Sequence, residues 1–180
     1  MTTGDSGIDP TVLRDRGGGE AHVKGGSTPL RIGLISDTHG LLRPEALEAM
    51  RGCDRIIHAG DIGGERILET LRRLAPVDAI RGNIDRAEWA AALPERLDLT
   101  VGGVRIHVLH DLKQLGGRED QVGAQVVVSG HSHEPGIHQH AGVLLVNPGS
   151  AGPRRFRLPV SIGYLHIEGS QARGELRILE

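Results

Sequence analysis

Two histidines near residue 130 are the first residues in this sequence that suggest chemistry. The apolar run Val126–Val128 is followed by Ser-Gly-His-Ser-His, so His131 and His133 lie two positions apart just beyond a predicted strand. Imidazole is the commonest protein ligand for borderline transition metals, and the pair therefore indicates a metal site. Taken alone, the pair fits two solvent-exposed loop histidines equally well.

Ligand-type side chains also follow four other apolar runs. They are Asp37 and His39, then Asp61, Asn83 and His110, each within three residues of the end of its run. In α/β sheets, ligands bind beyond the carboxyl ends of the strands, where such side chains gather. One aspartate after a strand is usually a turn or helix-cap residue, but five coinciding strand ends predict one shared site.

The residue types in this set favour a particular kind of metal chemistry. Two aspartates, one asparagine and four histidines are enough for two metal ions, and the absence of thiolates suits manganese, iron, zinc, cobalt or nickel. One shared carboxylate can hold two cations about 3.5–4 Å apart. A hydroxide between them would be acidified by both cations and could attack phosphorus, so the set points to phosphoryl transfer.

The elements that must position these side chains follow from hydrophobic periodicity. Strands are predicted at residues 30–36, 55–59, 77–81, 97–101, 104–109, 126–128, 143–146, 161–167 and 175–179, and helices at 44–51, 65–74 and 112–122, with a helical turn near Trp89. Early alternation of strands and helices followed by hairpins predicts an α/β sandwich of mixed sheets.

Length and composition limit the organisation and the functional classes. Residues 1–29 are rich in glycine and poor in periodic apolar residues, so we predict a flexible tail before one domain at 30–180. The formal net charge of -2 gives no clear nucleic-acid surface. No apolar run reaches the roughly 20 residues of a membrane helix, and Cys53 is the only cysteine. The expected compartment is therefore the cytoplasm, with no membrane partner.

The ordered motifs resemble one family. Asp37-x-His39, Gly60-Asp61, Gly82-Asn83, His110 and Gly130-His131-x-His133 are similar to the signature of the calcineurin-like metallophosphoesterases. The short chain, the Asp-Thr-His-Gly start and the Asn-Pro-Gly-Ser segment at 147–150 resemble its small YfcE-like phosphodiesterase branch, over residues 30–180. The resemblance implies a four-layer α-β-β-α sandwich of two mixed β-sheets.

The resemblance also implies roles for the individual residues. Asp37, His39 and His133 would hold the first metal ion, and Asn83, His110 and His131 the second, with Asp61 bridging both. Asp61, Asn83 and His131 are also the residues expected to take part in catalysis. The implied cofactors are two divalent transition-metal ions, Mn²⁺ or Ni²⁺ first and Fe, Zn, Co or Mg as alternatives. The implied partners are a small phosphodiester, with a cyclic nucleotide as one candidate, and further copies of the chain in a homo-oligomer.

Two positions depart from the family pattern. Ile84 stands where many members have a histidine that assists the leaving group, so a good leaving group should be favoured; the branch commonly lacks that histidine. Asp111 follows His110 where the family usually has glycine. It either caps the helix predicted from residue 112, which we favour, or supports a ligand imidazole by hydrogen bonding.

Several other residues have more than one interpretation. Arg154, Arg155 and Arg157 form either a phosphate clamp or an ordinary basic surface, and we take Arg154 as the candidate substrate-binding residue. We interpret His58 as a buried histidine, His107 as outward-facing, and His138 and His140 as solvated loop residues. Asp85 either orders the loop around Asn83 or pairs with Arg86.

Three functional classes follow. The leading one is a dinuclear metal-dependent phosphodiesterase. The second is a non-catalytic interaction module, because the retromer subunit that shares the family fold has lost metal ligands. The third is a phosphomonoesterase, which the missing histidine at Ile84 and the absence of a long insertion disfavour.

Overall fold

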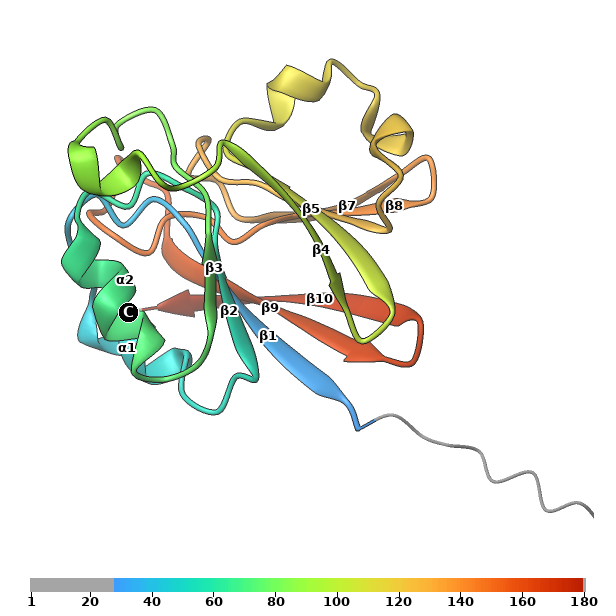
Figure 1. The fold of residues 1–180 in the computed structure, drawn as a ribbon, viewed down its shortest axis with the longest axis horizontal. Helices are drawn as coiled ribbons and strands as arrows, with labels where there is room; N and C mark the ends of the chain where they lie inside the picture. Colours follow the sequence, from blue (N-terminus) through green and yellow to red (C-terminus); the bar gives the residue numbers. More distant parts are fainter. Residues whose placement is uncertain (1–27, 180) are drawn as a thin grey trace, which may run out of the picture.

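Two five-stranded β-sheets packed face to face form the centre of residues 28–179, the part of the chain that the computed structural model describes (Figure 1). The predicted tail at 1–29 lies outside the described residues, except for residues 28 and 29. Within residues 28–179, no helix is long and apolar enough to cross a membrane.

Both sheets are mixed, as predicted. The first has the order β10-β9-β1-β2-β3, with bounds Gln171–Leu179, Val160–Glu168, Leu30–Ile35, Arg55–His58 and Val77–Ala79. The second has the order β4-β5-β6-β8-β7, with bounds Arg96–Val101, Val104–Leu109, Val126–Val128, Val143–Asn147 and Gly136–His140. β1, β2 and β3 are parallel, and so are β5, β6 and β8.

Apolar side chains fill the layers on both faces of the first sheet. Helices α1 (Pro44–Ala49) and α2 (Glu65–Arg72) cover its outer face, where Leu68 and Leu71 of α2 pack into a buried cluster with strand residues. Ile57 of β2 points the other way, into the core between the two sheets. Most residues of β1 and β2 are buried, because side chains on both faces of these central strands are covered.

The outer face of the second sheet has no α-helix within residues 28–179. The helix predicted at 112–122 is wrong: two short 3₁₀ helices, Leu112–Leu115 and Glu119–Val122, occupy this segment. Gly116 and Gly117 lie between them with φ of 60° and 78°, a left-handed conformation that ends a right-handed helix. The fourth layer of the sandwich is therefore made of 3₁₀ turns.

Two strands also differ from the prediction. His138 and His140 lie on β7, an edge strand paired antiparallel with β8, and not in a loop. The strand was missed because Gly136–His140 has only one large apolar residue and no alternating pattern. β10 begins at Gln171, four residues before the predicted start, and pairs along its whole length with β9.

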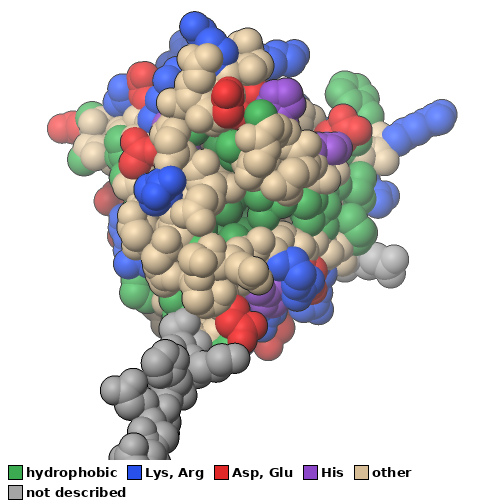
Figure 2. Space-filling view, turned by 90° about the vertical axis from the view of Figure 1, so that its right-hand side faces the viewer, with side chains coloured by type: hydrophobic (Ala, Val, Ile, Leu, Met, Phe, Trp, Pro, Cys, Tyr) green, Lys and Arg blue, Asp and Glu red, His purple; other side chains and the backbone are tan. Residues whose placement is uncertain are grey.

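The register places the carboxyl ends of the central strands at one edge of the sandwich. Ile35 of β1 pairs with His58 of β2, and Val108 of β5 pairs with Val128 of β6. The hairpins β4–β5 and β9–β10 lie at the opposite end (Figure 1). Viewed from that side, hydrophobic side chains gather at the centre of the surface, and charged side chains surround them (Figure 2).

Candidate metal centre

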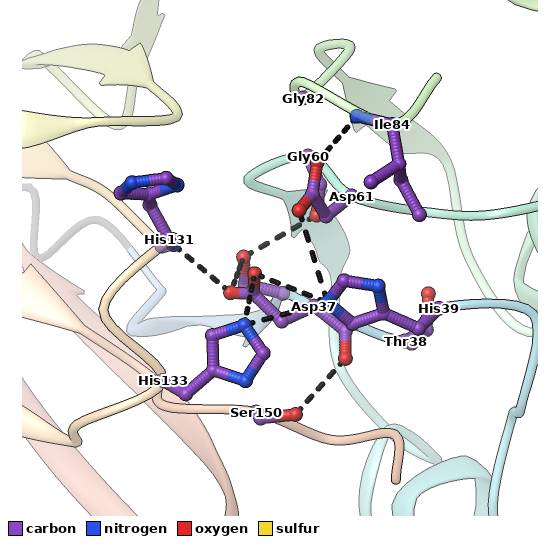
Figure 3. Close-up of polar contacts among 12 residues, drawn as sticks. Asp37, Thr38, His39, Gly60, Asp61, Gly82, Ile84, His131, His133 and Ser150 are labelled. Atoms are coloured by element: carbon purple, nitrogen blue, oxygen red, sulfur yellow. Dashed lines mark hydrogen bonds and ion pairs between the residues drawn. The ribbon is translucent and has the colours of Figure 1, made fainter. Parts of the chain in front are cut away.

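Asp37 lies at the middle of the candidate site, just beyond the end of β1 (Figure 3). Its side chain is fully buried, and Oδ2 accepts hydrogen bonds from the Ser36 hydroxyl at 2.7 Å and the His131 backbone N–H at 3.1 Å. Oδ1 is buried without a hydrogen-bond partner. It lies 3.2 Å from Nε2 of His133 and 3.8 Å from Nε2 of His39.

Asp61 occupies the loop after β2 and presents its two oxygens to different histidines. Oδ1 accepts the Ile84 backbone N–H at 3.1 Å, and Oδ2 lies 3.7 Å from Nε2 of His39 (Figure 3). Oδ1 also lies 3.3 Å from Nε2 of His110. A Cβ atom at Gly82 would overlap this carboxylate. The glycine before Asn83 is thus required for the Asp61 side chain to reach its position.

His110, at the end of β5, is oriented by a backbone carbonyl. Its Nδ1 lies 2.8 Å from the Ala59 carbonyl oxygen, which can only accept, so Nδ1 carries the hydrogen. Nε2 is buried without a hydrogen-bond partner and faces Asp61. A metal-binding histidine commonly donates its other ring N–H to a carbonyl or carboxylate in this way.

Burial and neighbouring charges shift the pKa values of these groups. Burial lowers the pKa of His39 and outweighs the opposite effect of Asp61 and Asp37. Burial alone would raise the pKa of Asp61 and lower that of His110. The close approach of the two side chains, with 3.3 Å between Asp61 Oδ1 and His110 Nε2, reverses both directions together with the backbone hydrogen bonds from Ile84 and to Ala59. Each group thus favours the charged form of the other, and a metal cation beside Asp61 would likewise favour its carboxylate form.

Two overlapping groups of ligand atoms result. The atoms of Asp37, His39 and His133 lie within 4.8 Å of one another, and so do those of Asp37, Asp61 and His110. The first group contains the three residues that the resemblance assigned to the first metal ion. Mixed nitrogen and oxygen donors, together with the unpartnered Oδ1 of Asp37 and Nε2 of His110, fit a divalent transition metal.

Asn83 and His131 lie at the rim of this cluster. Oδ1 of Asn83 is 3.2 Å from Nδ1 of His131, and the His131 ring stands 5.1 Å from the His110 ring at 78°. The His131 side chain is 44% exposed, whereas that of His110 is 7% exposed. The structure thus brings all seven predicted ligands to one place, five in the buried cluster and two at its mouth.

The backbone at five of these seven residues is in the left-handed region. Asp37, His39, Asp61, His131 and His133 have φ between 45° and 67°. A non-glycine residue in this region costs roughly 1–3 kcal/mol, and such residues concentrate at functional sites. No sequence pattern indicated this strain, because none of the five is glycine.

Arg155, and not the predicted Arg154, is the arginine that lies at the metal-ligand cluster. Arg154 lines a separate hollow together with Arg43 and Glu45. Arg155 lines the hollow of about 320 Å³ above the metal-ligand cluster, together with His39, Asp61, Asn83, Ile84, His131, Ser132, His133, Phe156 and Leu158. A phosphate held at the cluster would therefore meet Arg155 and not Arg154.

Two residues support the site in ways that the sequence only partly indicated. His58 is fully buried, as predicted. Its Nε2 lies 2.9 Å from Oγ1 of Thr38, and that hydroxyl donates a hydrogen bond to the Ile62 carbonyl. Burial lowers the pKa of His58 to about 4. Asp85 orders the loops, because its carboxylate accepts N–H groups of Ile62, Gly63 and Gly82 at 2.8–3.0 Å.

Two more residues act on the loop that carries His131. The Asn147 side chain was missed as a supporting group; it donates to the Gly130 carbonyl at 2.8 Å and contacts Ser132 Oγ at 3.0 Å. Asp111 accepts the Lys113 N–H at 3.0 Å, which confirms the predicted cap, although the helix it caps is a 3₁₀ turn. Its Oδ2 also lies 3.9 Å from Nε2 of His131.

Comparisons with known proteins agree with the fold and identify a family. A family model described as the calcineurin-like phosphoesterase superfamily domain matches residues 30–170. A protein from Methanothermobacter thermautotrophicus described as a probable metallophosphoesterase is 36% identical over 157 residues, which cover 81% of this chain and 90% of the relative.

Solved structures show the same fold at lower identity. Vacuolar Protein Sorting 29 from Cryptosporidium parvum superposes with a TM-score of 0.75 at 19% identity, covering 86% of this chain and 93% of the other. A structure described as a novel archaeal phosphodiesterase gives a TM-score of 0.69 at 24% identity, covering 82% of this chain and all of the other.

Proposed function

The chain belongs to the calcineurin-like phosphoesterase superfamily, and from that premise we propose that it is a dinuclear metal-dependent phosphodiesterase. The observation that carries the proposal is the position of Asp61, whose two carboxylate oxygens face His110 on one side and His39 on the other. A carboxylate placed in this way is suited to bridge two cations.

The proposed ligands divide between the two cations. Asp37, His39 and His133 would hold one, and His110, with Asn83 and His131 at the mouth of the hollow, would hold the other. When bound, the two cations supply Lewis acidity that activates water and offsets charge on the phosphate oxygens. We propose Mn²⁺ or Ni²⁺ as the first candidates, because imidazole and carboxylate donors suit them.

We propose that the substrate is a diester with a good leaving group. Ile84 follows Asn83 and lines the hollow with a side chain that is 42% exposed, so this position offers no proton to a leaving alkoxide. An activated ester needs no such proton donor. The similarity to the structure described as an archaeal phosphodiesterase supports the same choice. We propose a small phosphodiester as substrate and the cytoplasm as compartment, in keeping with a single, buried cysteine, Cys53.

The first test compares hydrolysis of bis(p-nitrophenyl) phosphate and p-nitrophenyl phosphate by metal-stripped protein. Manganese, nickel, zinc or magnesium is added back separately. We expect no hydrolysis without metal, and restored hydrolysis with manganese or nickel that favours the diester by at least about tenfold in kcat/KM. A preference for the monoester would instead support a phosphomonoesterase.

Matched variants connect this activity to the site. Asp61→Asn and His131→Ala should each lower kcat/KM by at least about 100-fold, because both remove groups that face the proposed cations. His138→Ala removes an exposed histidine on β7 and should leave kcat/KM within about twofold of the wild type. If the wild-type protein binds two metal ions yet cleaves neither ester, the non-catalytic interaction module becomes the better explanation.

A further inference from the structure

We propose that Phe156 forms a subsite for a planar aromatic group, such as a nucleobase, on an ester whose phosphate is held by Arg155 and the metal-ligand cluster. The inference rests on the proposed function, because it concerns the group esterified to the substrate phosphate. Both residues lie in the segment between β8 and β9, next to the candidate ligands His39 and Asp61.

Phe156 is held in an unusual conformation. It is the only phenylalanine in the chain, its side chain is 95% exposed, and its φ is 50°. Among residues 28–179, the non-glycine residues with positive φ are the five candidate ligands, Ala141 in the β7–β8 turn, and Phe156. A left-handed backbone conformation is strained for a bulky aromatic residue. Because the Phe156 ring is exposed, its burial does not offset this strain energy.

The hollow that Phe156 lines shows which groups a ligand beside its ring would meet. The hollow that it lines also contains the apolar side chains of Ile84 and Leu158 beside the metal-ligand cluster. Ile84 and Phe156 are two of four large apolar side chains that are exposed within residues 28–179, and both lie at this hollow. A ligand anchored by its phosphate at the cluster would therefore find an apolar, partly aromatic wall beside it.

Arg155 adds a positively charged side chain to the same wall of the hollow. The Arg155 side chain lines the same hollow as Phe156 and the candidate ligand His39. In the described part of the chain, no carboxylate is seen paired with Arg155 within ion-pair distance. A guanidinium can bind phosphate oxygens by two parallel hydrogen bonds and can also stack on a planar ring.

These groups together recognise a particular class of ligand. Metal ions at the cluster and the Arg155 guanidinium suit an anionic phosphate ester. The Phe156 ring suits a flat π-system that is joined to that phosphate through a sugar or another short linker. Stacking of a nucleobase on an aromatic side chain is typically sequence-tolerant, because every base has a π-face. The subsite would thus discriminate aromatic esters from purely aliphatic ones more than it would discriminate among bases.

Binding of reaction-product analogues tests the subsite without requiring turnover. Adenosine 5′-monophosphate and ribose 5-phosphate carry the same phosphate and sugar, and only the first has a planar ring. We expect the manganese-loaded full chain to bind the first roughly 5- to 100-fold more tightly, measured by calorimetry. Phe156→Leu should reduce this preference to about twofold or less, whereas Phe156→Trp should retain it.

Controls separate the subsite from general effects. Ile178→Ala removes an exposed apolar side chain on β10, at a different hollow, and should keep the wild-type preference. Arg155→Gln should weaken both ligands by a similar factor. Because Phe156 is so exposed, its variants should melt within about 2 °C of the wild type, so altered binding would not reflect unfolding.

The outcomes for the two proposals differ. Equal affinities of the wild type for the two phosphates, or a preference that survives in Phe156→Leu, would overturn the subsite even if the diester is hydrolysed. A ring preference that depends on Phe156, in a protein that hydrolyses no ester, would overturn the proposed function and leave a nucleotide-binding site in its place.

Discussion

The Asp37 carboxylate lowers the stability of the folded protein when no cation is bound. Its Oδ1 atom is buried without a hydrogen-bond donor, and its backbone has a φ of 54°. An unsatisfied buried polar group costs about 1–3 kcal/mol, and the strained backbone adds a similar amount. Both nearby imidazoles face this oxygen with Nε2, so a cation would satisfy three groups at once.

Asp37→Asn tests this balance of stability and binding. The amide oxygen can keep the hydrogen bonds from Ser36 and His131, while the amide NH₂ can donate toward the imidazoles. We expect the metal-free variant to melt at or above the wild-type temperature. Manganese at about 100 times its Kd should raise the melting temperature of the wild type by roughly 5–10 °C and that of the variant by much less.

The exposed carboxylate of Asp98 provides a control for this measurement. Asp98→Asn should respond to manganese as the wild type does, because Asp98 pairs with His107 away from the cluster. A full manganese response in Asp37→Asn would show that Asp37 is not a ligand.

At the scale of the elements, Asp85 joins the loops after β2 and β3. Its two oxygens accept N–H groups from Ile62 and Gly63 of one loop and from Gly82 of the other. These loops carry Asp61 and Asn83. The relative position of the two side chains therefore depends on a carboxylate that is not itself in either ligand group.

Asp85→Ala should weaken metal binding without removing a ligand. We expect the manganese Kd to rise roughly 10- to 100-fold, as is typical when a group supporting the ligands is lost. The free energy of unfolding of the metal-free protein should also fall, by about 2–4 kcal/mol, because one buried and two partly buried N–H groups lose their acceptor.

Asp54→Ala is the matched control for Asp85→Ala. Asp54 also accepts a backbone N–H, that of Arg31, but it lies at the opposite end of β2. The control should lose some stability and keep the wild-type Kd for manganese. If both variants bind manganese as tightly as the wild type, Asp85 has only a structural role.

Sequence reasoning located the elements that carry the ligands, and it failed where the signal was conformational. The buried strand β6 is a continuous apolar run, which predicts both the strand and the polar residues that follow it. The helix predicted at 112–122 was wrong because two adjacent glycines favour left-handed turns. The choice between Arg154 and Arg155 depends on the path of a loop, which no periodicity describes.

At the scale of the whole molecule, the site lies where the two sheets meet. The first sheet supplies Asp37 and Asp61, and the second supplies His110, His131 and His133 through loops that follow β5 and β6. The order of strands in each sheet depends on contacts between distant segments, so the sequence could predict that strand ends gather but not their distances. The chemical types of the ligands nevertheless indicated the site before its geometry was known.

His58, within the first sheet, should make global stability depend on pH. The folded protein keeps this histidine neutral down to a pKa of about 4, whereas its ordinary value in the unfolded chain is 6.5. Between these values the unfolded state binds the extra proton, so stability falls as pH falls. The contribution is absent above pH 6.5 and reaches about 3 kcal/mol near pH 4.

Urea unfolding of metal-free protein at pH 7.5 and 4.5 measures this effect. Between the two pH values, the wild type should lose about 2–3 kcal/mol more than His58→Gln, which has no titrating group at this position. The glutamine amide can still donate to Thr38 Oγ1, so the variant should fold. Equal losses in both proteins would mean that His58 is not kept neutral by burial.

The left-handed backbone at the five ligands also has a consequence for how such a chain changes over generations. At each of these positions, glycine or asparagine would relieve strain, so mutations that abolish the chemistry would tend to make the scaffold more robust. A gene copy released from selection for catalysis would lose its metal ligands first and its architecture last. Its strand-end loops would then be free to acquire other uses.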